Sequence, residues 1–127
     1  MPNLLKPTLR EKNRYIAFEI ISDVKFARDE IVKAVWNACL RFLGEKGASG
    51  TSLWIMDWDE EKQRGIIKVN HKAVDDVKAA LALMPEIKKE DGNRYKAVYR
   101  TLTVSGTLKK VREKTGIKGR NDSKTRK

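Results

Sequence analysis

Residues 14–23 read RYIAFEIISD, and this stretch decides the fold that we predict for the chain. β-branched and aromatic side chains dominate it, and Ile16, Phe18 and Ile20 occupy every second position. A repeat of two places these three side chains on one face of a β-strand. We therefore predict a strand at residues 14–23 with one face that packs against a hydrophobic core.

A helix is predicted to follow this strand, over residues 27–43. Apolar side chains recur there at helical spacing, from Ile31 to Phe42, and Gly44 supplies a stop signal. Ala27 stands at the expected N-cap, where a serine or threonine would cap the helix with its side chain. We therefore expect a long amphipathic helix whose first turn lacks that cap.

The rest of the chain is also predicted to consist of strands and helices joined by turns. The patterns predict two strands at residues 51–58 and 63–70, joined by a short polar turn, and a second helix at 73–84 that Pro85 ends. A turn at Asp91-Gly92-Asn93 and a strand at 95–105 are predicted next. A short basic helix is predicted to run from a cap at Thr107 to Gly116. In the strand at 95–105, Arg100 falls on the same side as Val98, Leu102 and Val104, which is the apolar side. We therefore expect a bulge or an edge position there.

The order strand–helix–strand–strand–helix–strand is that of the split β-α-β plan. We predict an α+β fold, a ferredoxin-like or RRM-like two-layer sandwich with two helices on one face of a four-stranded antiparallel sheet, and an added C-terminal basic helix. The predicted organisation is a basic extended arm over residues 1–13, a single ferredoxin-like domain over 14–116, and a basic tail over 117–127 that we expect to be disordered alone.

Length and composition argue against a membrane protein and against a secreted protein. The chain has 127 residues, which suits one domain, and no stretch approaches the ~20 apolar residues of a membrane span. No apolar segment near Met1 resembles a signal peptide, and the single Cys39 and single His71 exclude an internal disulfide and a Cys/His zinc site. We expect neither a membrane nor a secreted protein, and a cytoplasmic location.

Positive charge is concentrated at the two ends of the chain. The net charge is +11, of which residues 1–14 carry +3 and residues 109–127 carry +7, whereas the ninety-odd residues between carry about +1. A nearly neutral body with basic extensions is typical of proteins that bind a polyanion, with RNA or DNA as the leading partner. The alternative, that these charges only keep the protein soluble, remains open.

The reactive side chains do not form a catalytic pattern. Cys39 lies within the apolar stripe of the first helix, which is typical of inert packing, and His71 stands beside a helix start with no visible partner. The acidic pairs Asp75-Asp76 and Asp57/Asp59 fit a helix first turn and the start of a hairpin better than a Mg²⁺ site. We therefore predict no catalytic residue and no metal ligand in this chain.

The fold plan is also that of a single-strand RNA reader, whose third strand carries stacking aromatics. The matching residues 64–70 read RGIIKVN, so isoleucines stand at the stacking positions. Trp54, Trp58 and Tyr99 are the candidate stackers, and each fits a core or a protein interface equally well. We therefore expect recognition through phosphates and RNA shape more than through bases. The cations predicted to contact RNA are Arg10, Lys12, Arg14, Arg64, Lys68, Arg100, Lys109, Lys110, Arg112 and Lys114.

Four segments together resemble one known family. They are PTLREKNRYIAF at residues 7–18, AVW at 34–36, VDDVKAAL at 74–81 and RTLTVSGTLKK at 100–110. In their order and spacing they resemble the archaeal ribonuclease P protein component 2, and the likeness covers residues 7 to about 115.

The resemblance implies a non-catalytic subunit of a ribonucleoprotein that removes the 5′ leader of precursor tRNA. This endoribonuclease uses Mg²⁺ ions held by its RNA, so no cofactor is expected on this chain. The implied direct partners are the catalytic half of ribonuclease P RNA and ribonuclease P protein component 3, and precursor tRNA would be contacted only indirectly. The resemblance also allows this chain to form a homodimer within a heterotetramer. We predict that Trp54, Met56, Trp58 and Ile66 supply the protein interface.

Two other functions stay open at this point. The first is a stand-alone module of RRM-like fold that binds single-stranded nucleic acid, which would stack bases on Trp54 or Trp58. The second is a small nuclease or phosphatase in its own right, which would cleave substrate as pure protein with Mg²⁺.

Overall fold

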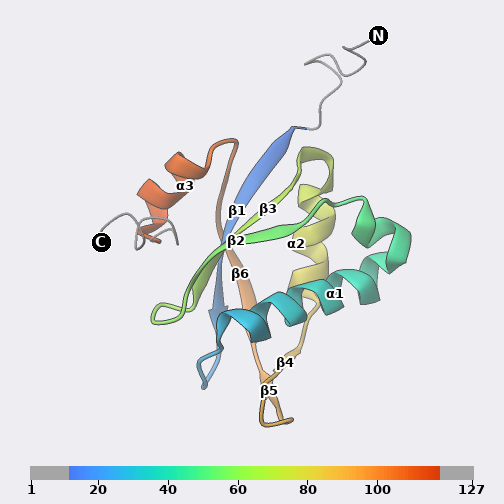
Figure 1. The fold of residues 1–127 in the computed structure, drawn as a ribbon, viewed down its shortest axis with the longest axis vertical. Helices are drawn as coiled ribbons and strands as arrows, with labels where there is room; N and C mark the ends of the chain where they lie inside the picture. The colour runs from blue at the N-terminus through green and yellow to red at the C-terminus, as the bar shows by residue number, and fades with distance from the viewer. Residues whose placement is uncertain (1–11, 118–127) are drawn as a thin grey trace.

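The fold is built on a four-stranded antiparallel sheet with the strand order β2-β3-β1-β6 (Figure 1). The computed structural model describes residues 12–117. The strands are β1 (Asn13–Ile21), β2 (Trp54–Asp59), β3 (Arg64–Asn70) and β6 (Val98–Ser105). β1, which contains the stretch that decides the fold, is thus a central strand paired on both sides.

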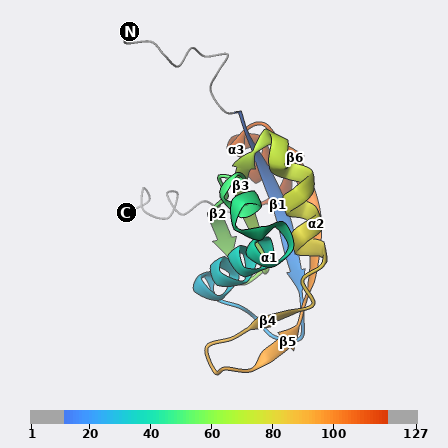
Figure 2. The same cartoon turned by 90° about the vertical axis from the view of Figure 1, so that its right-hand side faces the viewer.

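Helices lie on both faces of this sheet. The helices are α1 (Arg28–Ser49), α2 (Val74–Ala82), preceded by a 3₁₀ turn η2 (His71–Ala73), and α3 (Leu108–Thr115). α1 and α2 cover one face, and α3 lies on the other (Figures 1 and 2). The structure is therefore an α+β fold with a four-stranded antiparallel sheet and three helices, in the predicted element order.

The main core lies between the sheet and the helices α1 and α2. Ile16, Phe18 and Ile20 of β1 are buried in it, as the alternation predicts. The ring of Phe18 stacks between Trp58 and Tyr99, with centroid distances of 5.9 Å and 5.7 Å. The core face of β1 is therefore the face that the sequence pattern identifies.

Gly65 of β3 has a packing role at this aromatic stack. A Cβ added at Gly65 would lie 2.8 Å from the Trp58 ring, 2.9 Å from the Phe18 ring and 2.9 Å from the carbonyl oxygen of Asp57. Only a hydrogen fits there, because real Cβ contacts are longer. The glycine that matches the pattern of RNA readers is thus explained by the core.

Gly44 interrupts α1 where the sequence predicts its end. Its φ of 77° and ψ of 170° are non-helical, and the helix resumes after this kink up to Ser49. A positive φ of this kind favours glycine, which has no Cβ. The stop signal is confirmed, whereas the turns that follow it were not predicted.

The region predicted as one strand at residues 95–105 is two strands. β5 (Arg94–Lys96) pairs with an unpredicted strand, β4 (Glu86–Lys88), as a separate two-stranded ribbon. The turn between them contains Gly92 with a φ of 87°, at the turn predicted from Asp91-Gly92-Asn93. The ribbon projects from one end of the sheet beside α1 (Figure 1).

β6 confirms one prediction and corrects another. It is an edge strand, and its register with β1 shifts between Ala17 and Phe18, so Leu102 is bulged. The face assignment was wrong, because Tyr99 packs in the main core whereas Val98 is 59% exposed. The aromatic ring fills the core at this edge better than the smaller valine.

A second, smaller core lies under α3. Ala17 and Ile66 of the sheet are fully buried there against Val111 and Ile117. Ile117 was predicted to begin the tail, but it closes this cluster and therefore belongs to the folded unit. Residues 1–11 and 118–127, which form most of the predicted arm and tail, lie outside the described residues.

Candidate nucleic-acid interface

The α3 helix presents the densest group of free-standing lysines among the cations predicted to bind RNA. Lys109, Lys110 and Lys114 are exposed on it. The Thr107 side chain caps the helix by accepting from the Lys110 backbone N–H at 3.4 Å. Val111 and Leu108 pack this helix onto the small core, whereas the three lysine side chains stay exposed.

Arg112 differs from the other cations of α3. Its guanidinium donates to both oxygens of Asp57, with Nε 2.9 Å from Oδ2 and a terminal nitrogen 3.1 Å from Oδ1. The Asp57 side chain is 1% exposed, so this pair is largely shielded from water. These hydrogen bonds hold α3 to β2, and the RNA contact of Arg112 stays a prediction.

Two arginines of the sheet, Arg64 and Arg100, are also paired. Glu19 of β1 accepts from Arg64 of β3 at 3.2 Å and from Arg100 of β6 at 2.5 Å. One carboxylate therefore neutralises part of the charge of both neighbouring strands. Arg64 and Arg100 can offer further donors to a phosphate, but they present less net charge than the sequence count indicates.

The other cations predicted to contact RNA lie at or near the start of β1 and differ in their hydrogen bonds and exposure. The Lys12 side chain is exposed, and its carbonyl accepts from the backbone N–H of His71 at 2.7 Å. Arg14 donates to the Asn13 carbonyl at 3.0 Å, and Lys68 is partly exposed on β3. Arg10 lies outside the described residues. His71 thus tethers the chain entering β1, which agrees with its predicted place at a helix start.

The residues predicted to contact a protein partner do not form one exposed patch. Trp54 is 62% exposed and Met56 is half-buried beside the α3 core. Trp58 packs in the main core, and its indole N–H donates to the Phe26 carbonyl at 3.0 Å. Ile66 is fully buried beneath α3, so its assignment as a surface contact is corrected by the position of that helix.

Two ionisable groups of the main core, Cys39 and Tyr99, have raised pKa values. Burial raises the pKa of the Cys39 thiol to about 11, and burial raises the pKa of Tyr99 to about 12. Both groups are therefore protonated at neutral pH. Within residues 12–117, no three His, Cys, Asp or Glu side chains are grouped so as to hold a metal ion. No helix in the same range is long and apolar enough to cross a bilayer.

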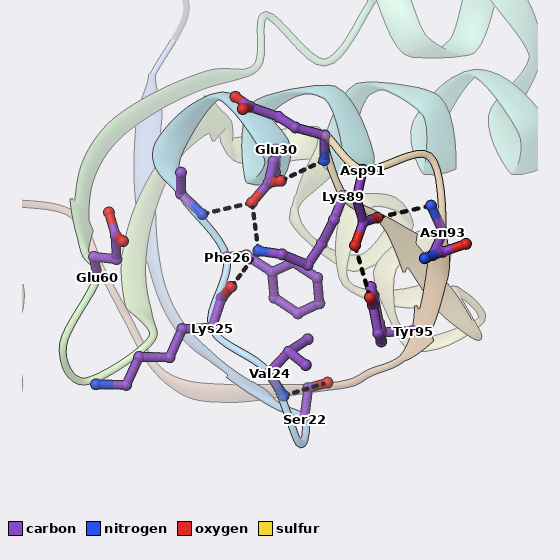
Figure 3. Close-up of polar contacts among 12 residues, drawn as sticks. Ser22, Val24, Lys25, Phe26, Glu30, Glu60, Lys89, Asp91, Asn93 and Tyr95 are labelled. Atoms are coloured by element: carbon purple, nitrogen blue, oxygen red, sulfur yellow. Dashed lines mark hydrogen bonds and ion pairs between the residues drawn. The ribbon is translucent and has the colours of Figure 1, made fainter.

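Glu30 is a structural centre that the sequence analysis did not identify. It is 6% exposed, and it accepts from the backbone N–H groups of Ala27 at 2.8 Å and Glu90 at 2.7 Å and from Lys89 Nζ at 3.1 Å (Figure 3). Burial alone would raise the pKa of Glu30, but these hydrogen bonds lower it below its ordinary value. The carboxylate supplies the half of a capping box that runs from the third helical residue back to the Ala27 backbone, and it joins the β4–β5 turn to α1.

The position of Glu30 at the third residue of the helix was the available signal. A glutamate there can accept from the N-cap backbone even when the N-cap is alanine. Its second role depends on Lys89 and Glu90, about 60 residues away, and no local pattern indicates it.

Comparison with known proteins identifies the family. The family model described as the Rpp14/Pop5 family matches residues 14–115. This range contains all three helices and all of the strands, apart from Asn13, the first residue of β1. The chain belongs to the Rpp14/Pop5 family. Within this family, the chain is 45% identical to the ribonuclease P protein component 2 of Thermococcus kodakarensis, over 89% of this chain and 90% of that protein.

Two further relatives carry the same protein name. The ribonuclease P protein component 2 of Pyrococcus furiosus is 47% identical over 89% of this chain and 90% of that protein. The protein of the same name from Methanobrevibacter smithii is 36% identical over 84% and 90%. A chain in a cryo-EM structure of yeast ribonuclease MRP has the same fold, with a TM-score of 0.62, 20% identity, and coverage of 94% of this chain and 99% of that one.

Proposed function

We propose that this chain is a non-catalytic, RNA-binding protein subunit of ribonuclease P. In that role it supports the catalytic RNA, which removes the 5′ leader of precursor tRNA by hydrolysing a phosphodiester. The name shared by relatives that are 36–47% identical over most of the chain supports this proposal. Its RNA contacts would be made through phosphates and the shape of folded RNA.

The single observation that carries this mode of binding is the position of α3. The helix covers the middle of the sheet face that an RNA reader would leave open, and it exposes Lys109, Lys110 and Lys114 on its outer side. Bases therefore have no aromatic platform in the middle of that face, whereas phosphates meet a row of ammonium groups. The strand order β2-β3-β1-β6 also supports the finer description of the fold as ferredoxin-like, or RRM-like.

The proposal extends to partners and location. We infer that the catalytic half of ribonuclease P RNA and ribonuclease P protein component 3 are the direct partners, with a cytoplasmic location. Precursor tRNA would be touched only indirectly, and Mg²⁺ would be held by the RNA rather than by this chain. The exposed indole of Trp54, with Met56 beside it, is the part of the predicted protein interface that the structure leaves accessible.

A reconstitution tests this function. The full chain, ribonuclease P protein component 3 of Pyrococcus furiosus and a transcript of the ribonuclease P RNA of that organism are combined at limiting Mg²⁺, and precursor tRNA cleavage is measured. We expect cleavage only when RNA is present, and a lower Mg²⁺ requirement when this chain is added. Cleavage by the protein alone would contradict the non-catalytic role. Unchanged cleavage on adding the chain would contradict the role as a subunit.

A further inference from the structure

A basic groove lies on the opposite face of the molecule from α3. It is a cavity of about 640 Å³ between α1 and the β4–β5 ribbon. The small side chains of Ala34 and Ala38 lie along its α1 wall, and Ile87 lies on its ribbon wall. None of the cations that line it was among the residues predicted to contact RNA.

One wall of the groove is a polar stripe on α1. Lys33, Asn37 and Arg41 are spaced four residues apart, so they lie on one face of the helix, and all three are exposed and line the cavity. Their side chains carry only hydrogen-bond donors, apart from the amide oxygen of Asn37. This wall therefore suits a ligand rich in acceptors.

The other wall carries two cations directly opposite each other. Lys88 of β4 is paired in register with Arg94 of β5, and both are exposed and line the groove. Directly opposed side chains lie about 5 Å apart at Cβ, and like charges at this spacing destabilise a strand pair. The neighbouring pair, Glu86 and Lys96, has opposite charges and lacks this conflict. An anion between Lys88 and Arg94 would remove the repulsion.

The carboxylates of the groove leave a positive excess. Five cations and three carboxylates line it. Glu30 is buried and already accepts from Lys89 and two backbone N–H groups, so it is neutralised within the fold. Glu86 lies opposite Lys96, which leaves Glu90 on the rim against four exposed cations.

We propose that this groove binds the phosphate backbone of a single-stranded RNA segment, so that the chain bridges two parts of its RNA. The proposal rests on the RNA-binding function proposed above and adds a second surface to it. Phe42 favours RNA over an acidic protein segment: its ring is 38% exposed at the groove, with the Arg41 guanidinium 5.4 Å from its centroid. A ring and a guanidinium side by side offer one unpaired base a stacking surface.

Two single charge reversals test this groove in the full chain. K88E places a carboxylate opposite Arg94, which replaces repulsion by attraction, so the ribbon should be at least as stable as before. R41E changes the other wall. K72E is the matched control, because Lys72 is an exposed lysine of η2 outside the groove and its reversal changes the net charge equally. Affinity for the ribonuclease P RNA transcript of Pyrococcus furiosus and a hydroxyl-radical footprint are measured for each variant.

We expect K88E and R41E each to weaken RNA binding at least about threefold relative to K72E at low salt, because each removes about one phosphate contact. The slope of log affinity against log salt should fall by about one. Both variants should lose one protected RNA segment that the α3 variant K109E/K110E retains.

Three results would overturn the groove proposal while leaving the proposed function intact. Affinities of K88E and R41E that equal the affinity of K72E would contradict the proposal. Loss of the same footprint by groove and α3 variants would show one RNA surface instead of two. Loss of binding to protein component 3 alone would make the groove a protein interface. A wild-type chain that binds no ribonuclease P RNA would instead contradict the function proposed above.

Discussion

Arg112 of α3 and Asp57 of β2 form a bidentate ion pair across 55 residues of chain. The arginine side chain is 26% exposed and the aspartate side chain is 1% exposed. This pair fixes α3 on the sheet next to Val111 and Ile117. Arg112 therefore positions the lysines of α3, while those lysines remain available to a partner.

Replacing Arg112 should cost stability. R112A leaves the buried carboxylate of Asp57 without its main partner, and we expect a loss of about 3 kcal/mol in the free energy of unfolding. R100A is the control, because Arg100 is mostly exposed and its loss should cost less than about 1 kcal/mol. Urea unfolding measures both variants. Equal losses would show that the Arg112–Asp57 pair does not anchor α3.

Charge reversal on α3 should affect RNA binding and leave folding intact. Lys109 and Lys110 are exposed and make no contact with either core, so K109E/K110E should keep its melting temperature within a few degrees. RNA affinity should fall at least tenfold, and the salt dependence should weaken by about two phosphate contacts. The double variant K46E/K72E, at two exposed lysines elsewhere, is the charge-matched control. Unchanged affinity of K109E/K110E would remove α3 from the RNA interface.

Gly65 should tolerate no side chain. G65A places a methyl group less than 3 Å from Trp58, Phe18 and the Asp57 backbone, and we expect a loss of about 2–3 kcal/mol from the strain. G106A is the comparison, because the nearest atom to a Cβ at Gly106 is an Arg14 nitrogen at 3.8 Å. Thermal unfolding should separate the two. A stable G65A variant would mean that the aromatic stack can shift.

The two tryptophans of β2 should behave differently. W58A removes a ring from the main core and a hydrogen bond to Phe26, so it should destabilise the fold by about 3 kcal/mol. W54A should change stability by less than about 0.5 kcal/mol, because Trp54 is 62% exposed. Urea unfolding gives both values. Strong quenching of Trp54 fluorescence by short unstructured RNA would favour the stand-alone single-strand binder.

Glu30 should make stability depend on acid pH. Its pKa in the folded state lies below the ordinary value of 4.5, so its contribution is present above that value and is lost as the pH falls through the folded pKa. E30Q should therefore be about 2 kcal/mol less stable than the wild type at pH 7, and the difference should shrink by pH 3. E45Q, at an exposed glutamate, is the control and should change stability by less than about 0.5 kcal/mol at pH 7. Urea unfolding at several pH values checks this.

Local patterns predicted the parts of the fold that depend on local chemistry. The period of two in β1, the helical spacing that ends at Gly44 and the cap at Thr107 all correspond to observed elements. The β4–β5 ribbon was missed because each of its strands has only three residues, which is too short for a periodic pattern. Its turn was nevertheless visible in the sequence at Gly92.

The candidate site was harder to predict because charge counts do not show pairing. Arg112, Arg64 and Arg100 count as free cations in the sequence, but Asp57 and Glu19 reach them only after the strands have paired. The burial of Ile66 also depends on where α3 docks. The exposed lysines of α3 could be predicted, since Leu108 and Val111 place the apolar side of this short helix on the sheet and leave Lys109, Lys110 and Lys114 exposed.

The strand order has a consequence for how the chain folds during synthesis. β1 leaves the ribosome first, but one of its two neighbours, β6, is made almost last. Until Val98–Ser105 emerges, one edge of β1 has no hydrogen-bonding partner from β6, and Glu30 lacks its partners Lys89 and Glu90 until those residues have been made. Closure of the sheet is therefore a late, long-range step, and the edge of β1 stays open to pairing with other chains until β6 is in place.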